Sequence, residues 1–179
     1  PHHLQNAGEA IHLIRYGLAA TLSGNIGIYG PVFEYMANAP LPGKEEYLDC
    51  EKYEIRHWDW GVKNKLTHVI SKVNAIRREH PALQQTNNIY FCGLENPQML
   101  AYYKWDHLRQ DEILVVISLD QFGSQSGFVR IPWEAMGPDS GGALEVVDLM
   151  TQTSYRWDKE WNYAELHPGL PFHIFHIRR

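Results

Sequence analysis

The chain has 179 residues, of which 44% are hydrophobic and 21% are charged, and this is ordinary usage for a globular protein. Its net charge of -5 and its pI near 6.0 argue against a nucleic-acid-binding surface. No run of about eighteen apolar residues is present, so we expect no membrane-spanning segment and no membrane partner, and no signal peptide is visible.

Two amphipathic helices are predicted in the first half of the chain. Over residues 9–22, apolar side chains recur at helical spacing, and Ser23-Gly24-Asn25 is typical of a helix C-terminus. Over residues 66–76, apolar side chains recur at i, i+3, i+4, i+7 and i+10. The second helix should end before Pro81, because the residue that precedes a proline disfavours the helical conformation.

A short strand and a long loop lie between these helices. Residues 26–30 form an apolar run that predicts a buried strand, and residues 31–60 are polar, rich in aromatic side chains and without a sustained period. A helix, a strand, a long loop and a helix in this order indicate a βα unit of a parallel sheet. In a (β/α)8 barrel such a loop contributes to the catalytic face. The alternative is a solvated insertion with its Trp and Tyr side chains packed beneath it.

Short β-rich runs separated by turn clusters follow from about residue 85 and predict an antiparallel sandwich. These runs are 88–92, 99–105, 112–119, 127–131, 144–149 and 172–177. Residues 114–117 are apolar at every position and should form a central strand that is covered on both faces. Residues 155–157 and 161–163 are predicted to form a further hairpin, joined by residues 158–160.

The cysteines and two of the histidines form no predicted metal or redox site. Cys50 and Cys92 lie far apart in the sequence and in no metal or redox motif, so we expect two reduced thiols in a cytoplasmic protein, with a disulfide as the less favoured alternative. His173 and His176 are three residues apart on a predicted strand. That spacing places them on opposite faces and argues against a shared metal ion.

Four segments carry a resemblance to a known family. They are Leu18-Ala19-Ala20-Thr21-Leu22-Ser23, Gly27-Ile28-Tyr29-Gly30, Glu45-Glu46-Tyr47-Leu48-Asp49-Cys50-Glu51-Lys52-Tyr53-Glu54-Ile55 and Asn74-Ala75-Ile76-Arg77-Arg78-Glu79-His80-Pro81-Ala82-Leu83. They resemble the C-terminal part of the α-1,4-glucan:maltose-1-phosphate maltosyltransferases, a family of the α-amylase superfamily (glycoside hydrolase family 13). The third segment is specific to this family, since other relatives of the α-amylases lack it. The resemblance implies an α/β part followed by an all-β part: the C-terminal part of a (β/α)8 barrel at residues 1–84, and an antiparallel β-sandwich domain at residues 85–179.

The resemblance also implies an activity for the intact protein. Members of the family transfer a maltosyl group from α-maltose 1-phosphate to the non-reducing end of an α-1,4-glucan and release phosphate. Retaining transfer of this kind uses two carboxyl groups about 5 Å apart. The family's catalytic carboxylates follow barrel strands that would lie upstream of Pro1, so we expect no catalytic residue in this chain and no activity from it alone. The resemblance also implies that the protein needs no cofactor or metal and forms a homodimer.

The family resemblance also nominates substrate-binding residues in the long loop. Lys52 and Tyr53 match a pair that contacts the maltosyl unit in the donor subsites. A lysine that donates to hydroxyl groups, and a tyrosine that offers a ring face and a hydroxyl, suit a sugar ligand. Glu34 and Glu51 are weaker candidates. The alternative is that Lys52 pairs with a neighbouring carboxylate on the surface and Tyr53 only packs.

Several readings stay open from the sequence. Trp58 and Trp60 could form a stacking wall for glucan. The favoured interpretation is that they cover the top of the following helix. The intact protein could be another member of glycoside hydrolase family 13, such as a trehalose-forming isomerase or an amylase. The chain could also be a stand-alone glucan-binding module, whose platform would be built from Trp105, Trp133, Trp157 or Trp161.

Overall fold

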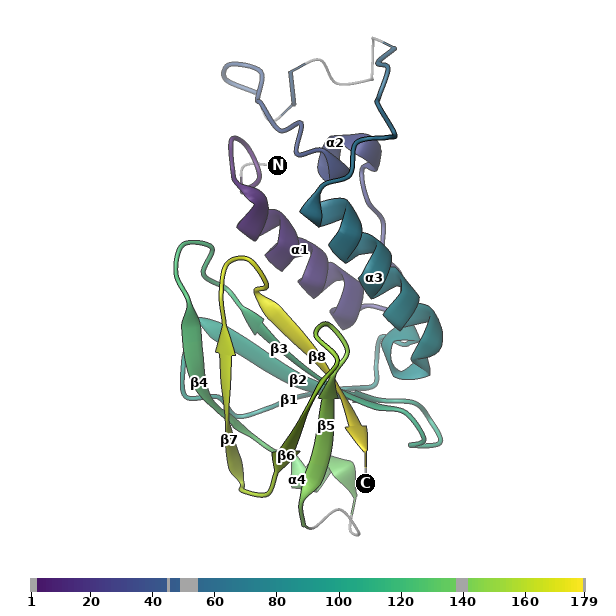
Figure 1. Ribbon diagram of the computed structural model, residues 1–179, viewed down its shortest axis with the longest axis vertical. Coiled ribbons are helices and arrows are strands. Elements are labelled where there is room, and N and C mark those ends of the chain that lie inside the picture. The colour runs from purple at the N-terminus through teal and green to yellow at the C-terminus, as the bar shows by residue number, and fades with distance from the viewer. Residues whose placement is uncertain (1–2, 45, 49–54, 138–141, 179) are drawn as a thin grey trace.

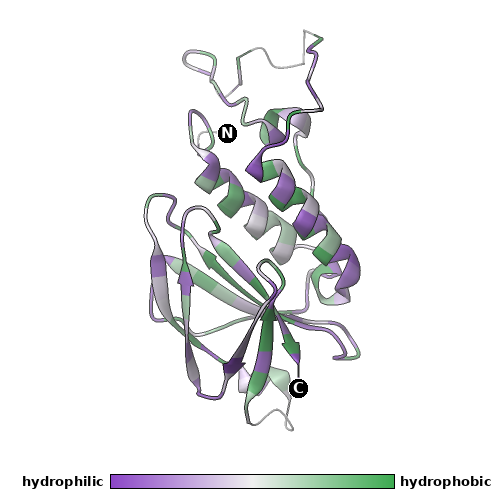
Figure 2. Ribbon diagram, in the orientation of Figure 1, coloured by the Kyte–Doolittle hydropathy of each residue, from purple (hydrophilic) through white to green (hydrophobic). Residues whose placement is uncertain are grey.

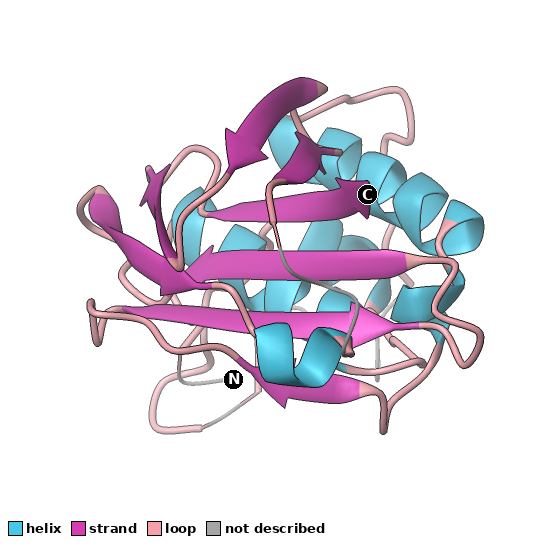
Figure 3. Ribbon diagram, turned by 90° about the horizontal axis from the view of Figure 1, so that it is seen from below, coloured by secondary structure: helices cyan, strands magenta, loops and turns pink. Residues whose placement is uncertain are grey.

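The computed structural model describes residues 3–44, 46–48, 55–137 and 142–178. Two long helices stand side by side at one end of the molecule, and strands form the other end (Figure 1). Seen from below, most of the helical ribbon lies behind the strands (Figure 3). Among the described residues, no helix is both long enough and apolar enough to cross a membrane.

The elements follow one another in a simple order of helices and then strands. The helices are α1 (Glu9–Leu22), α2 (Gly30–Glu34) and α3 (Lys65–Glu79), followed by the 3-10 turn η1 (Pro81–Gln84). The strands are β1 (Ile89–Phe91), β2 (Met99–Trp105), β3 (Glu112–Ser118), β4 (Gln125–Arg130), β5 (Leu144–Asp148), β6 (Thr153–Trp157), β7 (Trp161–Leu166) and β8 (Phe172–Arg178). The short helix α4 (Trp133–Met136) separates β4 from β5.

Both predicted amphipathic helices are confirmed. α1 has the predicted bounds, and α3 ends at Glu79, two residues before Pro81. A capping box begins α3: the Asn64 side chain accepts from the Thr67 backbone N–H (2.8 Å), and the Asn64 backbone N–H donates to the Thr67 hydroxyl (3.2 Å). Hydrophobic and hydrophilic segments alternate along both helices (Figure 2), and the buried positions of α3 repeat the predicted spacing.

The predicted strand at residues 26–30 is wrong. Residues 25–29 form no regular element, and Gly30 already begins α2 with a φ of 42°. A buried parallel strand needs neighbouring strands for its backbone groups, and within the described residues no strand pairs with this segment. The barrel assignment for residues 1–84 therefore stays a prediction, as does the domain boundary after residue 84.

The antiparallel sandwich is confirmed. Six strands form one sheet in the order β1-β2-β3-β8-β5-β6, and β4 and β7 form a two-stranded sheet, with every pair antiparallel. β3 lies inside the larger sheet between β2 and β8, and all seven of its residues are buried, as its apolar run predicted. Its alternate residues face opposite cores: Ile113 and Val115 face the helices, and Leu114 and Val116 face β4 and β7.

The predicted hairpin of residues 155–157 and 161–163 is wrong. Both segments are strands, but β6 pairs with β5 in the larger sheet, and β7 pairs with β4 in the smaller one. The chain crosses from one sheet to the other between Trp157 and Trp161. Sequence proximity favours a hairpin. The alternating burial of β7 is instead that of a strand with one face on the sandwich core, which β7 covers from the side opposite β5 and β6.

The described cysteine, Cys92, is a free thiol. Burial raises its pKa to about 12, so it is protonated at neutral pH. Cys50 lies outside the described residues.

α1 packs tightly on the sheet at Gly17. A Cβ at this position would lie 2.7 Å from Phe172 Cδ1 and 3.0 Å from Ile117 Cδ1. Both of these side chains are fully buried in the core that α1 shares with the sheet. The absence of a side chain at Gly17 thus sets the distance between the helical layer and the sheet.

We predict that Gly17→Val lowers the free energy of unfolding by about 1–3 kcal/mol, because the extra methyl groups overpack this contact. Chemical denaturation checks it. Gly27→Val is the control, since a Cβ at Gly27 meets no atom within 4 Å. Equal effects of the two substitutions would contradict the tight contact.

Candidate functional site

The loop between α2 and α3 is held together by aromatic and cationic side chains. The Tyr35 hydroxyl donates to the Asp59 carbonyl (2.9 Å), and the Tyr35 and Trp58 rings stack with centroids 5.7 Å apart. The Arg56 guanidinium lies 4.4 Å from the Trp58 ring centroid, within cation–π range. These contacts bring the end of the loop, residues 56–59, back onto its beginning at Tyr35.

A second contact joins the ends of the flanking helices. The Asn64 side chain, which caps α3, donates to the Glu34 carbonyl at the end of α2 (2.9 Å). A cavity of about 450 Å³ opens beside this contact. It is lined by Glu34, Tyr35, Trp60, Val62, Lys63, Asn64, Thr67, His68 and Ser71. A carboxylate, an ammonium group, hydroxyls and two aromatic rings around one hollow suit a polyhydroxylated ligand.

The residues predicted to bind substrate divide into two groups. Glu34 lines this cavity, and its role in orienting a ligand stays a prediction. Lys52, Tyr53 and Glu51 lie outside the described residues, so their roles stay predictions. The same holds for the catalytic carboxylates expected upstream of Pro1.

The two loop tryptophans have different surroundings. Trp58 stacks on Tyr35 and contacts Arg56, so it belongs to the support of the loop. Trp60 is 69% exposed and lines the cavity together with residues of α3. Trp60 is therefore the more exposed of the pair.

Sequence reasoning missed the residues that shape this cavity. Asn64 could have been found, because an Asn just before an amphipathic run is a helix N-cap signal. Tyr35 could not, because its partner Asp59 lies 24 residues away. Asn38 also escaped notice: it donates to the Ala7 carbonyl (2.9 Å) and ties the loop to the segment before α1.

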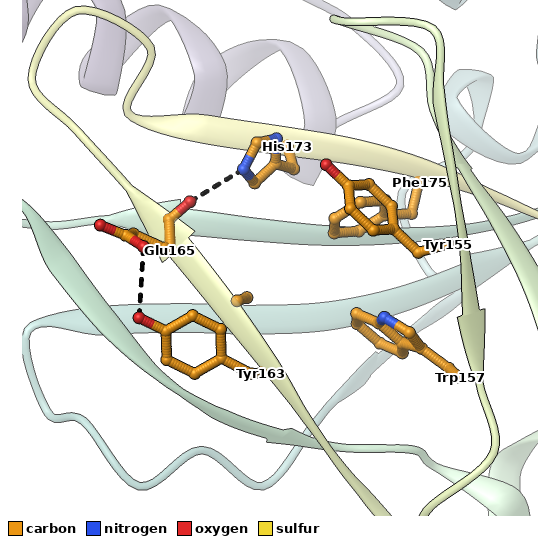
Figure 4. Close-up of a pocket in the computed structure, with 7 residues that line it drawn as sticks. Tyr155, Trp157, Tyr163, Glu165, His173 and Phe175 are labelled. Atoms are coloured by element: carbon orange, nitrogen blue, oxygen red, sulfur yellow. Dashed lines mark hydrogen bonds between the residues drawn. The ribbon is translucent and has the colours of Figure 1, made fainter.

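A second cavity, of about 190 Å³, lies in the sandwich between β6, β7 and β8 (Figure 4). It is lined by Tyr155, Trp157, Tyr163, Ala164, Glu165, His173 and Phe175. Two of its polar contacts are made within the protein: the Tyr163 hydroxyl donates to the Glu165 carboxylate (3.3 Å), and His173 Nε2 lies 3.0 Å from the Glu165 carbonyl oxygen.

The tryptophans proposed as a glucan platform do not form one exposed surface. Trp157 is 5% exposed and packs on Phe175, and Trp105 stacks on Tyr103. Trp105 and Trp133 pack against the same core as Trp157. Trp161 begins β7 and is partly buried. Trp105, Trp133 and Trp157 thus pack on the sandwich core.

His173 and Asp148 form a buried ion pair at the edge of the second cavity, with Nδ1 and Oδ2 3.0 Å apart. Burial is the largest effect on the pKa of His173 and acts to lower it, but the hydrogen bond and charge of Asp148 outweigh it, so the pKa is raised. Burial also acts to raise the pKa of Asp148, but hydrogen bonds from His173 and Thr151 outweigh it, so that pKa is lowered.

His173 and His176 lie on opposite faces of the sheet, as predicted. His173 contacts the Glu165 carbonyl of β7, whereas His176 lies near His80, which follows α3.

The fold of this chain matches part of two α-amylases of known structure. An α-amylase from Geobacillus thermoleovorans matches 95% of the chain at a TM-score of 0.64 with 15% sequence identity, and the match covers 33% of that protein. The maltogenic α-amylase AmyB from Thermotoga neapolitana matches 97% of the chain at a TM-score of 0.64 with 13% identity, and the match covers 37% of that protein. At such identities the likeness establishes the fold alone.

Sequence comparison identifies the relatives. Residues 91–177 match the family model described as "GLGE, C-terminal". The α-1,4-glucan:maltose-1-phosphate maltosyltransferase of Methylacidiphilum infernorum is 43% identical over 98% of the chain, and that of Chlorobaculum tepidum is 43% identical over 97%. The chain covers 26% and 27% of these proteins. The predicted resemblance is confirmed: this chain is a relative of the maltosyltransferases and spans about a quarter of their length.

The Asp148–His173 pair predicts a pH dependence of stability. A raised histidine pKa contributes stability that is complete below the ordinary value of 6.5 and is lost as the pH rises through the raised value. The lowered pKa of Asp148 contributes stability that is lost only when the pH falls into the acid range. We therefore expect His173→Asn to be more destabilising at about pH 5.5 than at about pH 8.5.

Denaturation of both proteins at the two pH values measures the difference. The exposed His57 provides the control, since His57→Asn removes an imidazole without a buried partner. A destabilisation by His173→Asn that stays constant, or grows with pH, would show that the pair is neutral in the folded protein.

Proposed function

We propose that the intact protein containing this chain transfers a maltosyl group from α-maltose 1-phosphate to the non-reducing end of an α-1,4-glucan, with retention of configuration and release of phosphate. The observation that carries this proposal is the 43% identity to proteins of that name over nearly the whole chain. The chain then supplies a C-terminal part of the enzyme. Acting alone it is inactive, because the two catalytic carboxylates belong to the remainder of the protein. The proposal includes a cytoplasmic homodimer without cofactor or metal in its chemistry.

In this proposal the chain positions substrate rather than reacting with it. Lys52 donates to hydroxyl groups of the maltosyl unit, and Tyr53 packs a ring against it. Glu34, aided by Glu51, orients the sugar from the cavity beside α2. Holding a sugar in a reactive pose accelerates transfer, because less translational and rotational entropy is lost on the way to the transition state. What supports this role is the built cavity at Glu34 and the bracing of the same loop by Tyr35 and its partners.

Another enzyme of glycoside hydrolase family 13 is the competing proposal, and the likeness to two α-amylases supports its fold alone. A trehalose-forming isomerase or an amylase has no use for a sugar phosphate. Release of inorganic phosphate from α-maltose 1-phosphate by the intact protein, dependent on added maltooligosaccharide, separates these activities. An intact protein that hydrolyses or isomerises maltooligosaccharides and leaves α-maltose 1-phosphate unchanged would contradict our proposal.

We predict that Lys52→Ala in the intact protein lowers kcat/KM for phosphate release by about 10 to 150-fold. A hydrogen bond to a charged group contributes about 1.5–3 kcal/mol, and each 1.36 kcal/mol is a factor of ten in rate. Initial-rate kinetics with α-maltose 1-phosphate measure the effect.

The matched control is Lys44→Ala, which removes an exposed lysine from the same loop. We expect it to leave kcat/KM within about twofold of the wild type, since an exposed charge contributes little. A change of less than about threefold in Lys52→Ala would remove Lys52 from the binding site, whatever the protein's activity.

A further inference from the structure

Three side chains from distant parts of the sequence meet where the C-terminal end of α3 reaches the sheet. His80 follows the last residue of α3, Asp111 directly precedes β3, and His176 lies near the end of β8. Asp111 Oδ1 lies 2.7 Å from His80 Nδ1 and 3.7 Å from His176 Nε2. One ligand atom from each of the three residues lies within 4.8 Å of the other two.

We propose that His80, Asp111 and His176 bind a divalent transition-metal ion, with Zn²⁺ as the fitting choice. Imidazole nitrogens and a carboxylate oxygen are common zinc donors, and three protein ligands with a water molecule complete a tetrahedral shell. Two neutral imidazoles and one carboxylate leave the zinc complex with a single positive charge. Calcium and magnesium prefer oxygen ligands, so the two histidines favour zinc over them.

The surroundings of the cluster fit a metal site. Asp111 Oδ2 accepts from the Ala82 backbone N–H (2.8 Å), which fixes the carboxylate with Oδ1 directed at the histidines. The His80 and His176 rings lie 4.9 Å apart at 60°. Side-chain exposures of 12% for His80, 11% for Asp111 and 24% for His176 leave a path for an ion and its water. Glu112 and Arg178 add opposite charges nearby.

Binding requires movements of the side chains, since the three donor atoms now lie within 4.8 Å of one another. Zinc ligands lie about 2.0–2.2 Å from the metal, so their donor atoms are roughly 3.3 Å apart in a tetrahedral site. The contact between His80 and Asp111 would lengthen and that between His176 and Asp111 would shorten. Both changes are within reach of rotations about side-chain bonds. Without the ion, the same groups form a hydrogen-bonded His–Asp pair with a second imidazole beside it.

A bound ion would have a structural effect. Its ligands come from the residue after α3, from the residue before β3 and from β8, so the ion would join the helical layer to the larger sheet. A ligand that binds the folded state alone raises its stability. This inference does not depend on the proposed transfer activity.

The test is equilibrium dialysis of the metal-free protein against ZnCl2, followed by measurement of bound zinc and of Tm. We expect the wild type to bind one equivalent that the double variant His80→Asn/His176→Asn lacks, with affinity at this site at least about tenfold weaker in either single variant. Zinc should raise the Tm of the wild type and leave that of the double variant unchanged. His107→Asn is the control, since this exposed histidine lies in the neighbouring β2–β3 turn outside the cluster, and it should behave as the wild type.

Equal zinc content and equal Tm shifts in the wild type and the double variant would overturn the proposal. Should the histidine variants fail to fold, Asp111→Asn replaces them, because an amide oxygen can still accept from Ala82. A direct measurement is the anomalous scattering of zinc in crystals of the wild type. A peak about 2.0–2.2 Å from His80 Nδ1, Asp111 Oδ1 and His176 Nε2 is expected, and its absence from this position contradicts the site.

Discussion

The arrangement of the whole helical layer depends on one buried cation, Arg77 of α3. Its guanidinium donates to the carbonyls of Ser23 (3.1 Å), Gly24 (2.8 Å) and Leu83 (3.3 Å), and also to that of Ala20. The last carbonyls of a helix have no partner within the helix, and a positive charge at that end is favourable. Arg77 thus satisfies the C-terminal end of α1 and fixes it to both α3 and η1.

A second cation binds the same helix end to the sheet. Lys104 of β2 donates to the carbonyls of Gln85 (2.7 Å) and Leu22 (3.3 Å). Burial, and after it the charge of Arg77, lowers the pKa of Lys104 to about 8, which is the cost of placing two cations beside one set of carbonyls. With the C-terminal ends of α1 and α3 held at the sheet, α2 and the beginning of α3 carry the loop cavity at the far end of the helices (Figure 1).

The elements that sequence predicted well are those with local causes. Periodicity gave α1 its bounds, and a run of apolar residues identified β3 as central. The two errors concern pairing. Residues 26–30 have an apolar strand composition but pair with no strand among the described residues. The segment from Tyr155 to Tyr163 divides between two sheets, because β7 covers from the other side the same core that β5 and β6 cover.

The functional residues follow the same rule. The family resemblance nominates Glu34 as a weaker candidate; Glu34 lines the cavity, and its role in binding stays a prediction. Two sets of contacts join residues 24 to 96 positions apart: the bracing of the loop by Tyr35, and the cluster of His80, Asp111 and His176. A single sequence carries no signal for contacts between residues so far apart. Family resemblance fills part of this gap, since it nominates Lys52 and Tyr53 without reference to their surroundings.

A crystal structure of the intact protein with α-maltose 1-phosphate, its catalytic carboxylates neutralised by substitution, would show directly whether this chain positions the donor. We expect Lys52 Nζ at about 2.7–3.2 Å from a hydroxyl of the sugar, with the Tyr53 ring against the same maltosyl unit. A sugar phosphate bound with Lys52 and Tyr53 remote from it would contradict the claim that this chain positions the donor.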